Sequence, residues 1–445
     1  MKTDKIPLIL MLSLITCLPL SAQQKPSEPN QVLTDQIKGD LISQLAGALR
    51  TKYVFEGKAD TIANAIVSKF KSGAYNNILQ GTELASAVTA DLLLLSGDKH
   101  LRLRYSEKVI PETADNDPMK IPTDQKLAYA TELKNSNYGI GKIEVLAGNV
   151  GLISFNFFCA PEFSGDTYAS AMNYLAHTDA LIIDLRKCRG SASIDATPFF
   201  SSYLFETPVH LYDLWWRQDN RTMQVWTYAH VPGTKYVKKP VYVLTSFATF
   251  SGAEQLAYDL QALKRAKIVG AATSGGANPG GDIRLTDHFS AFMPIGRPIN
   301  PLTKTNWEGK GVMPDVAVAP VRALSTAHGI VLSELEKQTT DDSRQQQIKK
   351  IRQNLEQSTM PLKTVNFYLD GYQSAREVFA VGSFNDWTPK ANPMRRTNNG
   401  WELQTEADSG KTVYQFIIDG KWIFDPKNPQ QAFDGLNSGS LREIQ

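Results

Sequence analysis

The residue in this sequence best placed to carry out covalent chemistry is Ser251. It follows a short β-branched apolar run, Val241–Leu244, which is typical of a buried strand, and it precedes apolar residues at helical spacing. A hydroxyl at a helix start lies beside unpaired backbone N–H groups and the positive end of the helix dipole, where a developing oxyanion is stabilised. Ser251 is therefore a candidate nucleophile.

The same serine also has a structural interpretation. The segment Ser251-Gly252-Ala253-Glu254 fits the Ser-x-x-Glu capping box, in which the two side chains satisfy orphan amides of the first helical turn. A serine can cap a helix and also react, so the local pattern leaves both interpretations open.

Two further candidates lie far from Ser251 in the sequence. His100 falls in SGDKHLRLRY, between a turn at Gly97-Asp98 and an alternating, strand-like segment. Histidine is the most frequent general base, although a histidine at such a junction is more often structural or on the surface. Glu308 lies near glycines in NWEGKGVMPD, which by itself is typical of a solvated turn.

Three sequence blocks, in order along the chain, resemble a family of serine peptidases. They are ALIIDLRKCRGSAS at 180–193, the set TFSGAE, AYDLQAL, VG and TSGG within 245–276, and NWEGKGVMPDVAV at 306–318. Together they are similar to the tail-specific (C-terminal processing) proteases, closest to the branch that includes the tricorn core protease and interphotoreceptor retinoid-binding protein. The resemblance extends over residues 35–320.

The resemblance implies a role for each candidate. Ser251 would be the nucleophile, His100 the general base and Glu308 the residue that orients the catalytic apparatus. The oxyanion hole would be formed by the backbone N–H groups of Gly252 and of Gly190, a glycine that by itself indicates a tight turn. A peptide or protein substrate is implied, and no metal or cofactor is expected.

A second mechanism known in this family is disfavoured. Relatives with a Ser-Lys dyad carry a lysine at the position that is Gly276 here. Because no lysine lies between Lys267 and Lys304, a Ser-His-Glu arrangement is the consistent alternative.

The elements around these residues predict a multidomain α/β protein. Three amphipathic stripes predict an N-terminal helical bundle at 35–105, followed by an irregular connector at 106–139 that is too short for a peptide-binding PDZ domain. Residues 140–322 alternate strands and helices, which indicates a layered domain with a largely parallel sheet. By resemblance this is a crotonase/ClpP-like peptidase core. Residues 323–363 are charged and helical, and we expect a solvated helical linker there.

The last segment, 364–445, has short alternating strands with turn glycines, typical of a small immunoglobulin-like β-sandwich. VFAVGSFNDWTP and YQFIIDGKWIFDPKNP resemble the glycogen/starch-binding module of branching enzymes and of the AMP-activated kinase β subunit. The resemblance implies an α-glucan ligand that stacks on Trp387 and Trp422 and bonds to Asn437. In the alternative interpretation, these tryptophans fill the core of the sandwich and the module only packs against a neighbouring domain.

Composition and the N-terminal segment predict an exported protein. Residues 1–22 have the charge, apolar core and small-residue end of a signal peptide, and 23–34 are expected to be a disordered tail. No later stretch is expected to anchor the protein in a membrane, so we expect a periplasmic or secreted location. The net charge of +2, without a basic cluster, gives no indication of a nucleic-acid partner. Cys159 and Cys188 remain after cleavage, either as buried thiols or as a disulfide.

The sequence as a whole predicts an exported serine peptidase that hydrolyses peptide bonds and carries a glycan-binding module. The alternative is a catalytically inactive protein on the same fold that binds an apolar ligand or a polysaccharide. The distance between the His100 imidazole and the Ser251 hydroxyl separates the two, because a general base must lie within hydrogen-bond reach of the proton it removes.

Overall fold

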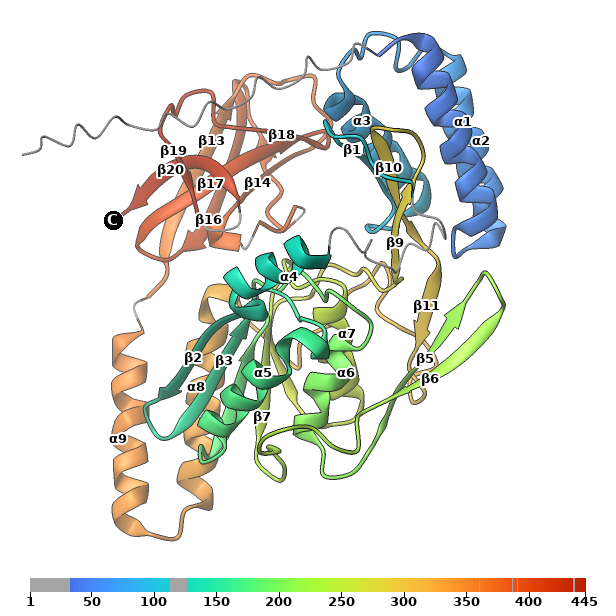
Figure 1. The fold of residues 1–445 in the computed structure, drawn as a ribbon. Coiled ribbons are helices and arrows are strands. Elements are labelled where there is room, and N and C mark those ends of the chain that lie inside the picture. The colour runs from blue at the N-terminus through green and yellow to red at the C-terminus, as the bar shows by residue number, and fades with distance from the viewer. Residues whose placement is uncertain (1–32, 113–125, 360, 386, 390, 435–436) are drawn as a thin grey trace, which may run out of the picture.

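The computed structural model describes residues 33–445, except for 113–125, 360, 386, 390 and 435–436. The expected signal peptide and most of the expected tail lie outside these residues. The chain is a mixed α/β multidomain protein, with helices toward its N-terminus and sheets toward its C-terminus (Figure 1).

The N-terminal bundle contains α1 (Asp35–Lys52), α2 (Glu56–Lys71) and α3 (Gly81–Ser96). Residues 33 and 34, which were expected at the end of the tail, belong to the bundle: Leu33 is buried, and the Thr34 hydroxyl accepts a hydrogen bond at the start of α1. Gly97 ends α3 in the left-handed conformation, with a φ of 74°. The chain then enters the short strand β1 (Arg102–Tyr105).

Strand β1 joins the bundle to the rest of the protein. It pairs antiparallel with β10 (Phe289–Pro294), which in turn pairs with β9 (Gly280–Arg284). The apolar side chains of β9 and β10 share one buried cluster with α1, α2 and α3. The strand that follows His100 is therefore held by a hairpin more than 180 residues later in the sequence.

The central sheet has six strands in the order β12-β8-β7-β4-β3-β2. All neighbours are parallel except β2 and β3, as the alternation of strands and helices predicts. The bounds are β2 (Ile140–Leu146), β3 (Val150–Phe155), β4 (Ala180–Asp184), β7 (Val241–Thr245), β8 (Lys267–Gly270) and β12 (Val316–Ala317).

Helices cover both faces of this sheet, so its strands are apolar on both sides. One face packs against α5 (Pro161–Leu175), α6 (Ala196–Ser201) and α7 (Gly252–Ala262). The other face packs against α8 (Pro320–Gln338), through Ala323, Ala327 and Val331. This differs from the expected solvated linker: α8 is a layer of the core, and only α9 (Asp342–Ser358), which packs beside it, is mostly exposed.

The remaining elements are shorter. Helix α4 (Lys126–Asn135) lies in the connector, and a separate sheet contains β5 (His210–Trp216), β6 (Arg221–Trp226) and β11 (Gly296–Ile299). Single 3-10 turns occur at Asn137–Gly139, Ser202–Leu204 and Ser383–Asn385.

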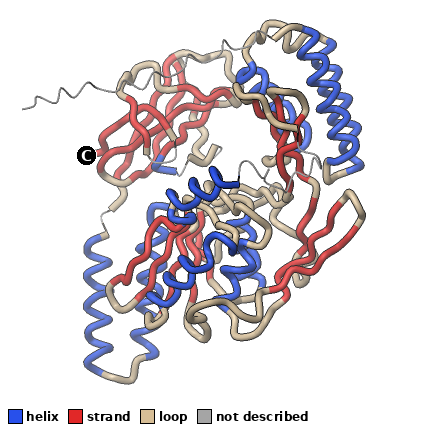
Figure 2. The backbone as a smooth tube through the Cα atoms, viewed as in Figure 1, coloured by secondary structure: helices blue, strands red, loops and turns tan. Residues whose placement is uncertain are grey.

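The C-terminal module consists of two sheets (Figure 2). Aromatic side chains make up much of the buried core between them. The first sheet contains β13 (Lys363–Asp370), β15 (Arg395–Arg396) and β16 (Gly400–Ala407). The second contains β14 (Val378–Gly382), β17 (Gly410–Ile418), β18 (Lys421–Ile423), β19 (Gln431–Phe433) and β20 (Ser438–Ile444). An ion pair of 2.8 Å between Arg322 of α8 and Asp408 links the module to the core.

Candidate active site

Ser251 lies in a strained turn between β7 and α7. Its φ of 55° and ψ of −122° place a non-glycine residue in a conformation that costs about 1–3 kcal/mol and persists only where the surroundings enforce it. Here the Phe250 N–H donates to Cys188 O at 3.1 Å, and the Ser251 N–H donates to the Glu254 carboxylate at 2.8 Å. The Glu254 carboxylate thus holds the backbone of Ser251, and the Ser251 hydroxyl lies within hydrogen-bond distance of His100.

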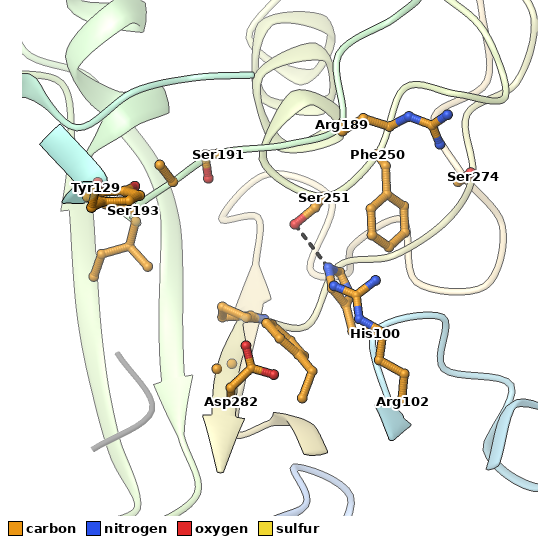
Figure 3. Close-up of a pocket in the computed structure, with 16 residues that line it drawn as sticks. His100, Arg102, Tyr129, Arg189, Ser191, Ser193, Phe250, Ser251, Ser274 and Asp282 are labelled. Carbon is orange, nitrogen blue, oxygen red and sulfur yellow. Dashed lines mark hydrogen bonds between the residues drawn. The ribbon is translucent and has the colours of Figure 1, made fainter. Parts of the chain in front are cut away.

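The structure brings the predicted base to the predicted nucleophile. His100 Nε2 lies 3.0 Å from Ser251 Oγ (Figure 3). The imidazole is held between the Phe250 and Phe292 rings, with centroid separations of 4.5 and 5.6 Å. Burial, followed by the charge of Arg102, lowers the pKa of His100 to about 3. The ring is therefore neutral at physiological pH, and Nε2 can accept the serine proton when the ring proton is on Nδ1.

Asp98 fixes the backbone of the histidine rather than its ring. Asp98 Oδ1 accepts the His100 N–H at 2.9 Å, and Oδ2 accepts from Asn278 Nδ2 at 3.1 Å and from the Tyr53 hydroxyl at 3.3 Å. Tyr53 follows α1, so the bundle contributes directly to the position of His100.

The third predicted residue, Glu308, does not contact the imidazole. In the described part of the chain His100 Nδ1 has no hydrogen-bond partner, and Glu308 Oε2 accepts the Ala277 N–H at 2.6 Å instead. The reason lies in the loop that carries Glu308: Trp307 Nε1 donates to Gly276 O at 2.9 Å, and Gly309 N donates to Gly275 O at 2.9 Å. These bonds hold the loop that carries Glu308 against residues 275–277, next to His100.

Three buried carboxyl groups lie behind the Ser251–His100 pair. Burial raises the pKa of Glu254 to about 7, although four donors from Ser251, Thr273 and the 275–276 backbone stabilise its charged form. Burial and then the charge of Asp98 raise the pKa of Glu308 to about 8. Burial also raises the pKa of Asp98. At neutral pH these three groups therefore carry less negative charge than three fully ionised carboxylates would.

The predicted oxyanion-hole glycines lie directly beside the nucleophile. Gly190 has a φ of +126°, and a Cβ there would be 3.0 Å from Ser251 Cβ and 3.5 Å from Gly252 N. Among the residues that the structure describes, no backbone carbonyl takes the N–H of Gly190 or of Gly252. Both groups are thus available to a substrate oxygen.

A cleft of about 630 Å³ opens over Ser251 and His100. Its walls come from the loop after β4, the turn before α7, strand β1 and the β9–β10 hairpin, and they include Arg102, Arg189 and Asp282 (Figure 3). A side chain or a short peptide fits a cleft of this size.

The predicted glycan-binding residues differ in their accessibility. Trp387 is only 5% exposed, and its Nε1 donates to Asp434 at 2.6 Å. Trp422 stacks against it, with centroids 6.3 Å apart, and is 44% exposed. Asn437 is half-buried, and its backbone N–H donates to Asp434 Oδ1. Trp387 and Asp434 also line a cleft of about 290 Å³ between the module and the core.

Other features concern the cysteines, metals and membranes. Cys159 and Cys188 are free, buried thiols rather than a disulfide, and burial raises the pKa of Cys159 to about 11. Within the described ranges, no group of His, Cys, Asp and Glu side chains could hold a metal ion. No helix there has the length and apolarity needed to cross a membrane.

Sequence reasoning missed several residues of this site. The Ser-x-x-Glu pattern identifies Glu254 only as half of a capping box, and its second role, accepting from the 275–276 backbone, cannot be read from local spacing. Asp98 was an available signal, because an aspartate in a turn often accepts the backbone N–H two residues later, as it does from His100 here. The Phe250 and Phe292 rings come from separate elements, so no sequence pattern joins them to the histidine.

Comparison with known proteins matches three parts of the chain. Residues 149–318 match the model of peptidase family S41, and residues 33–135 match the N-terminal domain of peptidase S41 in eukaryotic IRBP. Residues 366–439 match the glycogen recognition site of AMP-activated protein kinase. These matches confirm the predicted resemblance to a serine-peptidase family and to a glycogen-binding module.

Individual known proteins are similar either to a short segment of this chain or to most of it at low sequence identity. The 5'-AMP-activated protein kinase subunit beta-2 of Homo sapiens is 34% identical over 82 residues, which are 18% of this chain and 29% of that protein. The chain thus spans less than a third of the length of this curated relative. A photosystem II D1 C-terminal processing protease is 15% identical, with a TM-score of 0.41 over 65% of this chain and 94% of that one. A lipoprotein from Streptococcus agalactiae is 14% identical, with a TM-score of 0.45 over 69% and 98%.

Proposed function

We propose that this protein is a serine peptidase that uses Ser251 as nucleophile and His100 as general base, and the match of residues 149–318 to the model of peptidase family S41 supports this. The observation that carries the proposal is the separation of 3.0 Å between Ser251 Oγ and His100 Nε2, at the floor of an open cleft. A neutral imidazole within hydrogen-bond reach of a serine hydroxyl is the arrangement that activates such a nucleophile.

The geometry supports the following sequence of steps. His100 Nε2 accepts the proton of Ser251 Oγ as the oxygen attacks the substrate carbonyl carbon. The N–H groups of Gly252 and Gly190 donate to the oxyanion of the tetrahedral intermediate. The imidazolium then gives its proton to the leaving amine, and water, activated by the same imidazole, hydrolyses the acyl-enzyme.

We assign Glu308 a positioning role in this mechanism. It holds the Ala277 N–H, next to Asn278, whose amide donates to Asp98, and Asp98 holds the backbone of His100. Glu308 therefore orients the catalytic histidine through the 277–278 loop and Asp98. Its contribution to kcat is expected to be smaller than that of His100.

The proposal extends to the finer assignments that the sequence predicts. The motif blocks support a protease of the tail-specific, tricorn-like type, with a crotonase/ClpP-like core and an immunoglobulin-like module. The N-terminal composition supports an exported protein, periplasmic or secreted. The alternative, an inactive binding protein on the same fold, retains the fold but predicts no covalent reaction at Ser251.

A fluorophosphonate probe separates these two functions, because it forms a bond to an activated serine with loss of fluoride. We expect the wild-type protein to be labelled, and Ser251→Ala and His100→Ala to lose labelling. Ser193→Ala is the matched control, since Ser193 lines the same cleft and its hydroxyl has no hydrogen-bond partner within the described residues. Equal labelling of wild type and Ser251→Ala would overturn the assignment.

We also propose that the C-terminal module binds an α-glucan, on the strength of its match to a glycogen recognition site. The exposed face of Trp422 would stack on a sugar ring, with Trp387 behind it and Asn437 at the edge of the site. Affinity electrophoresis of the full chain in glycogen tests this: we expect retardation, and its loss in Trp422→Ala. Trp226→Ala is the control, because Trp226 is 47% exposed but lies on β6. Unretarded migration of the wild type would refute glycan binding.

A further inference from the structure

The C-terminal module meets the peptidase core at the first turn of α8, and a cleft of about 290 Å³ opens there between the two domains. The turn Ser383–Asn385 of the module packs against α8, and Pro320 of α8 lines the cleft. Trp387 and Asp434 line it from the module, and the segments that follow β3 and β4 line it from the core. The cleft is therefore a feature of the two domains together.

The module side of this interdomain cleft carries residues of the proposed glycan site. Asp434 joins two of them, because its Oδ2 accepts from Trp387 Nε1 at 2.6 Å and its Oδ1 accepts the Asn437 backbone N–H at 2.9 Å. Trp387 in turn stacks on the exposed Trp422. The surface that would bind a glycan therefore extends from Trp422 to the edge of the interdomain cleft.

The core side of the interdomain cleft offers polar groups that can bind a ligand. Lys187 and Asn156 are exposed and line the cleft, and across the described residues neither side chain forms a hydrogen bond or an ion pair. Arg186, beside them, is fixed: its guanidinium donates to both Asp184 oxygens, at 2.9 and 2.6 Å, and to Pro320 O at 2.8 Å. The core therefore presents an ammonium and an amide next to a rigid ion pair.

The chemistry of the lining indicates a neutral, polar ligand. Two carboxylates line the interdomain cleft, Asp184 and Asp434, together with two cations, Arg186 and Lys187, so their formal charges cancel. Such a lining disfavours an anion or a cation, whereas sugar hydroxyls both donate to carboxylates and accept from amides and cations. We propose that the α-glucan bound by the module continues into this cleft, where Lys187 and Asn156 of the core donate to its hydroxyl groups. This inference rests on the proposed glycan binding and adds the peptidase core to that site.

The two core residues are also connected to the proposed oxyanion hole. The Asn156 carbonyl accepts the Arg189 N–H at 2.8 Å, and Lys187 lies three residues before Gly190. A sugar chain that holds the Lys187 and Asn156 side chains therefore restrains the segment that carries the Gly190 N–H. Because a preorganised donor stabilises an oxyanion better than a mobile one, bound glucan is expected to activate the peptidase site.

Calorimetric titration of the full chain with maltoheptaose tests the shared site independently of catalysis. We expect the wild type to bind, and Lys187→Ala and Asn156→Ala each to weaken the affinity about fivefold, the usual effect of one hydrogen bond. Both replaced side chains are exposed, so the variants should keep the fold. Lys310→Ala is the matched control: Lys310 is also an exposed lysine of the core, but it lines a separate cleft of about 700 Å³ against the module. It should keep the wild-type affinity.

The rate of fluorophosphonate labelling tests the connection to the oxyanion hole. Saturating maltoheptaose should raise the wild-type rate about fivefold, which is the lower end of the usual coupling between two sites. The double variant Lys187→Ala/Asn156→Ala, at its own saturating concentration, should show almost no increase, because the sugar would then lack its contacts with the segment before Gly190.

The outcomes separate this inference from the proposed functions. Wild-type affinity in both core variants would overturn the shared site, although the module alone would still bind glucan. A wild-type labelling rate that saturating maltoheptaose leaves unchanged would overturn the connection to the oxyanion hole. A wild type that does not bind maltoheptaose would overturn glycan binding and this inference together. Failed labelling of the wild type would overturn the peptidase assignment, and the calorimetric affinities would still decide the shared site.

Discussion

Replacing Glu308 by glutamine is expected to stabilise this protein in alkaline solution. Burial, and then the neighbouring charge of Asp98, raises the pKa of Glu308 from about 4.5 to about 8. A carboxyl group whose pKa is higher in the folded state contributes stability that is fully present below the unfolded value, about pH 4.5. That contribution is lost as the pH rises through about 8.

The size of the effect follows from the same pKa difference. The gap between 4.5 and about 8 corresponds to at most about 5 kcal/mol of pH-dependent stability. Glutamine stays neutral and keeps an oxygen that can accept the Ala277 N–H, so it resembles the protonated acid at every pH. Allowing for relaxation around the charge, we expect a gain of about 1–3 kcal/mol at pH 9 and almost none at pH 5.

Thermal unfolding at pH 5, 7 and 9 measures this prediction. For a core of this size, each kcal/mol corresponds to about 2–4 °C in Tm. Glu334→Gln is the opposite control. Burial alone would raise the pKa of Glu334, but hydrogen bonds from Lys267 and Tyr242 lower it overall. The charged Glu334 therefore stabilises the folded protein above about pH 4.5. Replacing it by glutamine should lower Tm at pH 7. A Glu308→Gln profile parallel to the wild type from pH 5 to 9 would refute the reasoning.

Three further predictions concern the site itself. If His100 is the base, kcat/KM should vary less than about threefold between pH 5 and 7, because burial and Arg102 lower its pKa to about 3; an acid limb near pH 6.5 would contradict this. Gly276→Ala should lower the rate of probe labelling at least about tenfold, because its Cβ would lie 2.2 Å from the Phe250 ring and 3.0 Å from His100 Cε1; wild-type labelling would show that the ring can shift freely. Glu254→Gln should destabilise the fold by about 2–3 kcal/mol in urea unfolding at pH 8, because an amide N–H₂ would face backbone donors; unchanged stability would mean that the four donors find other acceptors.

Much of the fold followed from local pattern. The stripes of α1, α2 and α3 and the alternation around β7 and α7 were readable because each element buries one regular face. Helix α8 differs from the expected solvated linker because polar and charged residues separate its apolar ones, and only the sheet beneath explains their spacing. Composition cannot reveal a partner surface that comes mostly from strands 50 or more residues earlier, such as β7 and β8.

The site likewise contains residues that the sequence identifies and residues whose place depends on the fold. Ser251 could be proposed because it lies in a motif block, and His100 because the resemblance implies a general base in SGDKHLRLRY; the structure places the two side chains in contact. The place of Glu308 could not be derived, because it depends on a tether from Trp307 to Gly276 that fixes the direction of a whole loop. The burial of Trp387 likewise depends on its bond to Asp434 and on Trp422, neither of which has a fixed spacing from it.

The pairing of β1 with β10 has a consequence for how activity would arise during synthesis. Residue 100 leaves the ribosome first, residue 251 follows much later, and the strand that docks the former ends only at Pro294. A growing or truncated polypeptide that stops short of that strand would have both reactive groups but no means of joining them. Hydrolysis would then begin only after the N-terminal bundle has docked on the peptidase core through β1 and β10. Any event that separates the bundle from the core would abolish activity, even though Ser251 and His100 stay chemically unchanged.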